Sequence, residues 1–164
     1  MKKTSSILVM VFCFVLTACG QTNKENSNLP QPKGFVNDFE NLLTDRQEEY
    51  LDSLITDYEK QTKIEIAIVT IDSSMTSAEK FDKYTLELAN YWGVGKKDLD
   101  NGVLIGVSST LRRIRIQNGF GIEEILSDEE TKKIIDAFFI PNFKNGDYFE
   151  GIKLGTIEIM EKLK

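Results

Sequence analysis

The sequence contains no histidine and only two cysteines among its 164 residues. Without histidine there is no imidazole to act as a general base, as a zinc ligand or as a charge that switches near neutral pH. Cys13 and Cys19 both lie in the N-terminal segment. The rest of the chain therefore has no thiol for disulfides, thiolate catalysis or cysteine-based metal sites, and chemistry depends on carboxylates, hydroxyls, Lys, Arg or a hard metal ion.

The apolar N-terminal segment is too short to cross a bilayer as a helix. It spans residues 7–16, whereas a membrane-spanning helix needs about 20 apolar residues. Lys2 and Lys3 precede it, an order typical of a secretory signal, and Leu16-Thr17-Ala18-Cys19 resembles the lipobox of bacterial lipoproteins. This resemblance implies that residues 1–18 are a signal peptide and that Cys19 is acylated. An ordinary signal peptide with a coincidental cysteine is the alternative.

The residues that follow Cys19 are expected to connect a lipid anchor to a globular domain. Residues 20–33 are polar and include two prolines, so we expect residues 19–33 to form a lipidated, flexible tether. Residues 34–164 suit one domain. Two acyl chains anchor a protein stably in a lipid bilayer, which predicts a location in the cell envelope. Gly20 after Cys19 favours the outer membrane, if the organism has one.

The charge of the chain excludes one class of partner. The formal net charge is −6, and removal of Lys2 and Lys3 leaves 18 basic against 26 acidic residues, a net charge of −8. Nucleic acids and anionic headgroups repel such a protein, and cations are attracted to it. Nucleic-acid binding is therefore not expected.

Four helices are predicted from capping residues and apolar periodicity. Thr44 with Gln47 begins the first, and Ser77 can cap the second. Ser127 with Glu130 begins the third, which Pro141 is expected to end. Asp147 with Glu150 begins the last, where Gly151 and Gly155 share a face and indicate close approach of another element.

Three strands are predicted between these helices. Residues 64–71 and 103–107 are β-branched and nearly continuously apolar, as in strands covered on both faces. Residues 111–117 alternate and follow a short turn, which indicates a hairpin. The expected fold is α/β, a three-layer α/β/α sandwich with a small mixed β-sheet flanked by about four main helices.

Polar residues concentrate in three loops, and sites in open α/β sheets form where loops converge at strand ends. The loops are residues 36–38, 93–102 and 118–124. We expect them to meet and to bind Ca²⁺, which takes six to eight oxygen ligands. A turn with no ligand is the alternative for Asp100-Asn101-Gly102, and a loop cap near the first helix is the alternative for Asp38. The candidate metal ligands are Asp38, Asp98, Asp100, Asn101 and Glu123.

Arginines along the third strand raise a further possibility. Arg113 and Arg115 share one face of that strand, and Arg112 precedes them. A clamp for an anion such as phosphate is one interpretation. A solvated strand face is the preferred one.

The order of these motifs resembles the TPM-domain family over residues 35–164. The family includes a thylakoid acid phosphatase linked to photosystem II repair and an accessory subunit of an acetylcholine receptor. The resemblance implies an α/β/α fold, calcium binding in loops at one end of the sheet and, in the plant protein, acid phosphatase activity. The matching stretches are Val36-Asn37-Asp38, Leu43-Thr44, residues 62–70, residues 91–95, residues 100–104, residues 112–116, residues 119–123, residues 141–144 and residues 146–148.

Three functions remain open from the sequence. The preferred hypothesis is a membrane-tethered, Ca²⁺-binding accessory module for the assembly or turnover of envelope proteins, with an envelope protein as partner. The second is an acid phosphatase in which Asp98 or Asp100 acts as nucleophile or holds a metal that activates water. It is disfavoured by the missing nucleophile–base pair. The third is a structural lipoprotein with no specific ligand.

Overall fold

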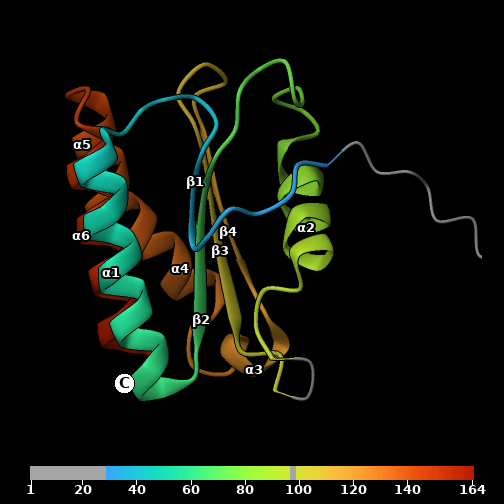
Figure 1. Ribbon diagram of the computed structural model, residues 1–164, viewed down its shortest axis with the longest axis vertical. Coiled ribbons are helices and arrows are strands. Elements are labelled where there is room, and N and C mark those ends of the chain that lie inside the picture. Colours follow the sequence, from blue (N-terminus) through green and yellow to red (C-terminus); the bar gives the residue numbers. More distant parts are fainter. Residues whose placement is uncertain (1–28, 97–98) are drawn as a thin grey trace, which may run out of the picture.

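The computed structural model describes residues 29–96 and 99–164, so the predicted signal peptide, Cys19 and Asp98 lie outside the described residues. The sheet has four strands in the order β1-β2-β3-β4 (Figure 1). β1, β2 and β3 are parallel, and β4 is antiparallel to β3. Their bounds are β1 (Val36–Asp38), β2 (Glu65–Thr70), β3 (Gly102–Ser108) and β4 (Arg113–Asn118).

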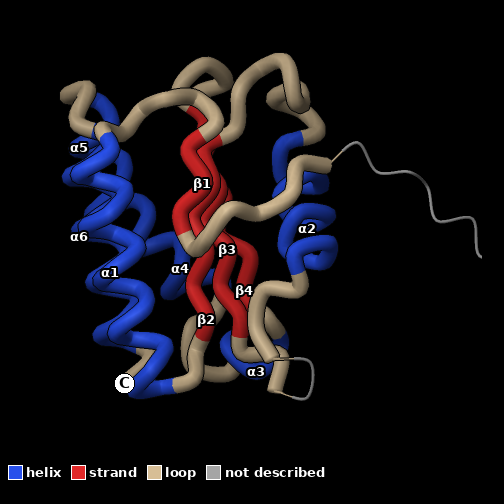
Figure 2. The backbone as a smooth tube through the Cα atoms, in the orientation of Figure 1, coloured by secondary structure: helices blue, strands red, loops and turns tan. Residues whose placement is uncertain are grey.

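Helices cover both faces of this sheet, which confirms the three-layer α/β/α fold (Figure 2). α2 lies on one face, whereas α1, α6 and the segment from α4 to α5 lie on the other (Figure 1). None of the helices in the described residues combines the length and apolar composition of a membrane span. The bounds are α1 (Asp45–Thr62), α2 (Phe81–Trp92), α3 (Phe120–Glu123), α4 (Asp128–Ile134), the π-helix η1 (Ile135–Phe139), α5 (Ile140–Lys144) and α6 (Tyr148–Lys162).

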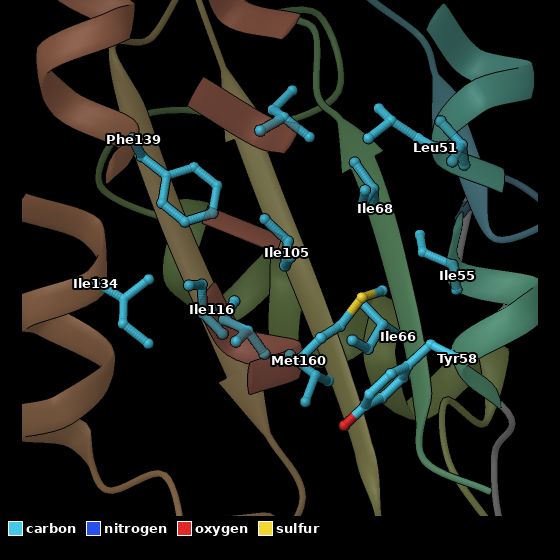
Figure 3. Packing of buried hydrophobic residues seen from close by; sticks show 14 of the residues in the cluster. Leu51, Ile55, Tyr58, Ile66, Ile68, Ile105, Ile116, Ile134, Phe139 and Met160 are labelled. Atoms are coloured by element: carbon cyan, nitrogen blue, oxygen red, sulfur yellow. The ribbon is translucent and has the colours of Figure 1, made fainter. Parts of the chain in front are cut away.

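The two central strands bury apolar side chains on both faces. Ile66 and Ile68 of β2 and Ile105 of β3 contact the layer of α1, η1 and α6 (Figure 3). Val69 and Leu104 join a second cluster under α2. Successive residues of a strand point to opposite faces, so two apolar layers follow directly from the continuous apolar runs of β2 and β3.

Helix caps form where the sequence predicts them in three cases. Gln47 Oε1 accepts from the backbone N–H of Thr44 at 2.9 Å, and Asp147 Oδ1 accepts from the N–H of Glu150 at 3.0 Å. Ser127 Oγ accepts from Glu130 N–H at 3.3 Å. Each bond satisfies a donor that the first turn of a helix leaves free.

Two boundaries differ from the prediction. Val36-Asn37-Asp38, expected to be a loop, forms β1 and pairs in parallel with Ile68, Val69 and Thr70; a three-residue strand is too short to show periodicity. Ser77 does not cap a helix. Its carbonyl accepts from Lys80 N–H in a turn, and α2 begins at Phe81.

Pro141 does not end its helix, because the chain accommodates it with a π-helix. Proline has no N–H and clashes with the carbonyl four residues earlier in an α-helix. In η1 the N–H of Ile140 bonds to the carbonyl of Ile135, five residues back, and the helix continues through Lys144 as α5. The side chain of Asn142 donates to the carbonyl of Phe138 at 2.7 Å, which satisfies an acceptor near the irregularity.

Residues 29–33 pack on the domain, although the sequence predicts a flexible tether up to residue 33. Leu29 packs against the cluster under α2, and Trp92 Nε1 donates to the carbonyl of Pro30 at 2.7 Å. The N–H of Lys33 donates to Asn37 Oδ1, also at 2.7 Å. These contacts offset the loss of chain entropy, so the folded unit includes residues 29–33.

Gly155 of α6 lies against the ring of Phe139, as the predicted close approach requires. A Cβ added to Gly155 would be 2.0 Å from Phe139 Cε2. We expect Gly155→Ala to lower the free energy of unfolding by about 1–3 kcal/mol, the usual cost of overpacking, in urea denaturation. Gly34→Ala is the control, since its Cβ would meet only Asp52 Oδ1, at 3.3 Å. Equal losses in the two variants would contradict this account.

Candidate functional site

The predicted ligands lie at opposite ends of the sheet, so the expected convergence of three loops is wrong. Asp38 ends β1 beside Thr70, at the carboxyl end of the parallel strands. Asp100 and Asn101 precede β3, and Glu123 follows β4, which runs back to the amino end of β3. The length of β3 separates the two groups, roughly 20 Å at ~3.3 Å per residue. Asp38 therefore cannot share a metal ion with the other candidates.

Asp38 and Glu40 hold loops together at the carboxyl end. Asp38 accepts from the N–H of Leu43 at 2.7 Å and from the hydroxyl of Thr70, which supports the loop-cap alternative. Glu40 accepts from the backbone N–H groups of Ser109 and Thr110 at 2.8 and 3.1 Å. These bonds tie the loop after β1 to the β3–β4 hairpin, so both carboxylates have structural roles.

At the amino end, three chain segments meet through glycines. A Cβ on Gly102 would be 2.1 Å from the carbonyl oxygen of Val94, and one on Gly119 would be 2.0 Å from that of Asp100. A Cβ on Gly121 would be 2.2 Å from the carbonyl oxygen of Leu99. Only glycine permits such close backbone contact. These glycine contacts bring the segments after α2, before β3 and after β4 together in one surface.

The side chain of Asn101 stabilises this surface through two hydrogen bonds. It is 9 % exposed; its Oδ1 accepts from Lys96 N–H at 2.8 Å, and its Nδ2 donates to the Lys63 carbonyl at 2.6 Å. Asn101 thereby joins the loop after α2 to the end of α1. Because Oδ1 is engaged in this bond, the structure gives Asn101 a role in the scaffold.

An ion pair joins the same two elements. Lys96 Nζ lies 3.0 Å from Glu59 Oε1 on α1. The hydrogen bond from Lys96 is the main cause that lowers the pKa of Glu59; desolvation opposes it, and the attraction of nearby lysines adds to it. Both side chains are partly exposed, so this pair adds little to stability. The ion pair links the loop after α2 to α1.

A pocket of about 380 Å³ opens at this end of the sheet, and Asp100 and Glu123 are its only charged lining residues among those described. Asp100 is exposed and has a φ of 46°, a conformation that Asp tolerates better than most residues. Leu86 of α2 and Phe120 of α3 also line the pocket. Phe120 is 78 % exposed and Leu86 is 49 % exposed, so the pocket has an apolar wall and an acidic rim.

The described residues supply few of the carboxylates that the predicted calcium site needs. No group of three or more Asp, Glu, His or Cys side chains with metal-binding geometry occurs in residues 29–96 and 99–164. Asp100 and Glu123 supply two carboxylates where calcium needs six to eight oxygens. Calcium binding that also uses Asp98 stays a prediction.

The arginine face of β4 contacts α2 and is solvated in part, since Arg113 is exposed. Arg113 pairs with Asp82 at 2.7 Å. Gln117 Nε2, on the same face, donates to Thr85 Oγ1 at 2.9 Å. Bonding to α2 accounts for Arg113 and Gln117 on this face of the strand.

Comparisons with known proteins decide the family. A family model described as the TPM domain matches residues 36–162. The chain belongs to the TPM-domain family. None of the curated proteins matches this TPM protein.

Solved structures agree with the TPM assignment. The N-terminal domain of a protein from P. gingivalis is 33% identical, with a TM-score of 0.71, and the match covers 79% of this chain and 81% of that one. BA42 from Bizionia argentinensis is 24% identical, with a TM-score of 0.64, over 76% and 83% of the two chains. The N-terminal domain of cg2496 from Corynebacterium glutamicum is 12% identical, with a TM-score of 0.58, over 84% and 85%. The last two show the fold alone.

Leu86 and Phe120 are the residues of this site that sequence reasoning missed. Leu86 lies outside the apolar stripe of its helix, and an apolar residue off the stripe is the signal that could have identified it. Phe120 stands between Gly119 and Gly121, a context that suggests a backbone constraint. Its exposure becomes apparent only when α3 is placed.

Removal of the Asn101 side chain tests its role in the scaffold. We expect Asn101→Ala to lower the free energy of unfolding by about 1–3 kcal/mol, because the Lys63 carbonyl and the Lys96 N–H lose their partner. Urea denaturation measures the change, and faster hydrogen exchange at the Lys96 amide locates it. Asn145→Ala, at an exposed loop residue, is the control. A loss no larger than that of the control would rule out the role.

Proposed function

We propose that this TPM domain is a membrane-tethered accessory module that docks an envelope protein at the amino end of its sheet. The docking surface consists of Leu86, Phe120, Asp100 and Glu123, which line the pocket at this end. The exposure of Phe120, at 78 %, is the observation that carries the proposal. Exposed apolar side chains gathered beside a pocket are typical of protein interaction sites, and aromatic residues dominate the energy of such interfaces.

Charge complementarity indicates the chemistry of the partner. Asp100 and Glu123 line the pocket, and no basic residue is among its described lining. A partner segment with an apolar side chain for the Leu86–Phe120 wall and a Lys or Arg for the carboxylates fits this surface. Opposite charges on the two partners would guide association and set the register of docking.

The rigidity of the surface also suits docking. Close glycine contacts and the Asn101 bonds hold its segments in place. A surface that is ordered before binding loses less conformational entropy on association. The same rigidity would keep Phe120 exposed, although water would otherwise favour its burial.

The phosphatase alternative is not favoured. A nucleophile needs a base within hydrogen-bond reach or a metal that activates it, and the chain has no histidine. The carboxylate of Asp100 takes part in none of the side-chain hydrogen bonds or ion pairs found in the described part of the chain. The proposed docking needs no chemical step and no bound calcium.

Attachment to a membrane is the second part of the proposal. Its support is the order of two lysines, an apolar run and Leu16-Thr17-Ala18-Cys19 at the start of the chain. Leu29 and Pro30 contact the domain near Trp92, so residues 20–28 would be the connection between a lipid on Cys19 and the folded unit. Nine residues reach at most ~30 Å when extended, which would keep the docking surface close to the membrane.

Photo-cross-linking in cells that produce the protein tests the docking surface. A photoreactive side chain replaces Asn90, an exposed residue that lines the pocket. We expect one reproducible protein adduct, whose yield falls at least about tenfold in Phe120→Ser, since an interface anchor of this size contributes 1.4 kcal/mol or more. Tyr50→Ser removes a 47 % exposed aromatic residue of α1 and should leave the yield unchanged.

The outcomes separate a docking module from a spacer. An adduct that depends on Phe120 and weakens in Asp100→Asn supports the proposal, because Asn tolerates the positive φ of this position and removes only the charge. A structural lipoprotein would give no reproducible adduct. An adduct that Phe120→Ser and Tyr50→Ser reduce equally would place the contact elsewhere.

Cell fractionation tests the lipid anchor. We expect the wild-type chain in the membrane fraction and Cys19→Ser in the soluble fraction, because the hydroxyl of serine cannot receive the thioether-linked lipid. Cys13→Ser is the matched control and should remain with the membrane. If Cys19→Ser also sediments with the membrane, acylation at this residue does not anchor the protein.

A further inference from the structure

A second pocket lies at the carboxyl end of the sheet, opposite the docking surface. This hairpin pocket has a volume of about 540 Å³ and is lined by the β3–β4 hairpin and the junction of α5 and α6. The size lies within the range of pockets that hold small molecules. Its lining includes Arg112, Arg113, Phe143, Lys144 and Tyr148.

The charge of the hairpin pocket is opposite to that of the docking surface. Three of its lining residues are basic and none of those described is acidic, although the chain carries 26 acidic against 20 basic residues. Arg113 is neutralised by Asp82 at 2.7 Å. Arg112 and Lys144 form none of the ion pairs found between the described residues, whereas most of the other exposed lysines on the helices do. Two positive charges therefore remain available at this pocket.

The backbone conformation at Arg112 is unusual for a long side chain. Its φ is 51°, a left-handed conformation that Gly and Asn adopt more readily than a long side chain. The carbonyl of Ser109 accepts from the N–H of Arg112 at 3.3 Å, so the turn itself needs only the backbone. The turn alone gives no reason for arginine at this position, and a ligand for the guanidinium would give one.

Apart from Ser108, the remaining lining residues of the pocket are aliphatic or aromatic. The rings of Phe143 and Tyr148 lie 4.8 Å apart between centroids, at an angle of 31°, and Phe143 also packs on Phe139 in an edge-to-face arrangement. This packing fixes the aromatic surface beside the cations. A guanidinium binds planar carboxylate or phosphate groups through two parallel hydrogen bonds, and an ammonium group adds a second charge.

We propose that the hairpin pocket binds a small organic anion, in which a carboxylate or phosphate group is attached to an apolar or aromatic body. Arg112 and Lys144 hold the anionic group, and Phe143 with Tyr148 contacts the body. The pocket and the docking surface use different residues at opposite ends of β3. A negative result for one proposal therefore does not contradict the other.

Isothermal titration of the full-length chain, kept soluble in a nonionic detergent, tests the proposal. The probes are benzoate, phenyl phosphate, benzyl alcohol as the neutral analogue, and inorganic phosphate. We expect benzoate or phenyl phosphate to bind at least tenfold more tightly than benzyl alcohol, and phenyl phosphate more tightly than inorganic phosphate. The tighter of the two aromatic anions identifies the preferred group. The dissociation constant should rise with ionic strength, since the attraction is between charges.

Variants link the binding to the pocket. Lys144→Gln, at an exposed position, and Arg112→Asn, which suits a positive φ, should each raise the dissociation constant at least tenfold with unchanged circular dichroism. Lys60→Gln, at an exposed lysine of α1, should leave it unchanged. Chemical-shift changes at the amides of Phe143 and Tyr148 give a second readout that needs no variant. Equal affinity for benzoate and benzyl alcohol, unchanged affinity in Lys144→Gln, or shifts confined to other residues would overturn the proposal.

Discussion

The burial of both faces of β2 and β3 is the constraint on which the rest of this structure depends. Ile66, Ile68 and Ile105 need a helical layer on one side, and Val69 with Leu104 needs another on the opposite side. Parallel strands of this kind are stable only when both faces are covered. The helices that supply this cover are joined to the strands by loops, and these loops gather at the two ends of the sheet. The functional surfaces proposed for this TPM domain lie at those ends.

The two ends are built by different physical means. At the amino end, glycines let backbones approach more closely than any side chain would permit, and Asn101 supplies the hydrogen bonds that hold them. The carboxylates of Asp100 and Glu123 are left at the rim beside exposed Phe120. At the carboxyl end, the carboxylates of Asp38 and Glu40 accept hydrogen bonds from loop backbone N–H groups. The charged residues that line the neighbouring pocket are basic. One end therefore suits a cationic and apolar protein segment, and the other suits an anion.

Much of the fold was predictable because local signals agree with the tertiary structure. The continuous apolar runs of β2 and β3, the alternation of β4 and the capping residues Gln47, Ser127 and Asp147 each predict the element that forms. The predictions failed where a distant contact overrides the local rule. β1 is a strand only because β2 pairs with it, and Pro141 lies within a continuous helical segment only because η1 shifts the hydrogen-bond pattern.

By itself, the sequence determined the three-layer α/β/α class and the TPM family, because apolar periodicity, caps and motif order are properties of short segments of chain. It also supplied the residue types of the candidate site. Only the tertiary structure decided which of these residues meet. Asp38 ends a strand parallel to β3, whereas Glu123 follows an antiparallel one, so the two lie at opposite ends of the sheet. Strand direction and pairing arise from contacts between residues far apart in the chain, and no local pattern encodes them.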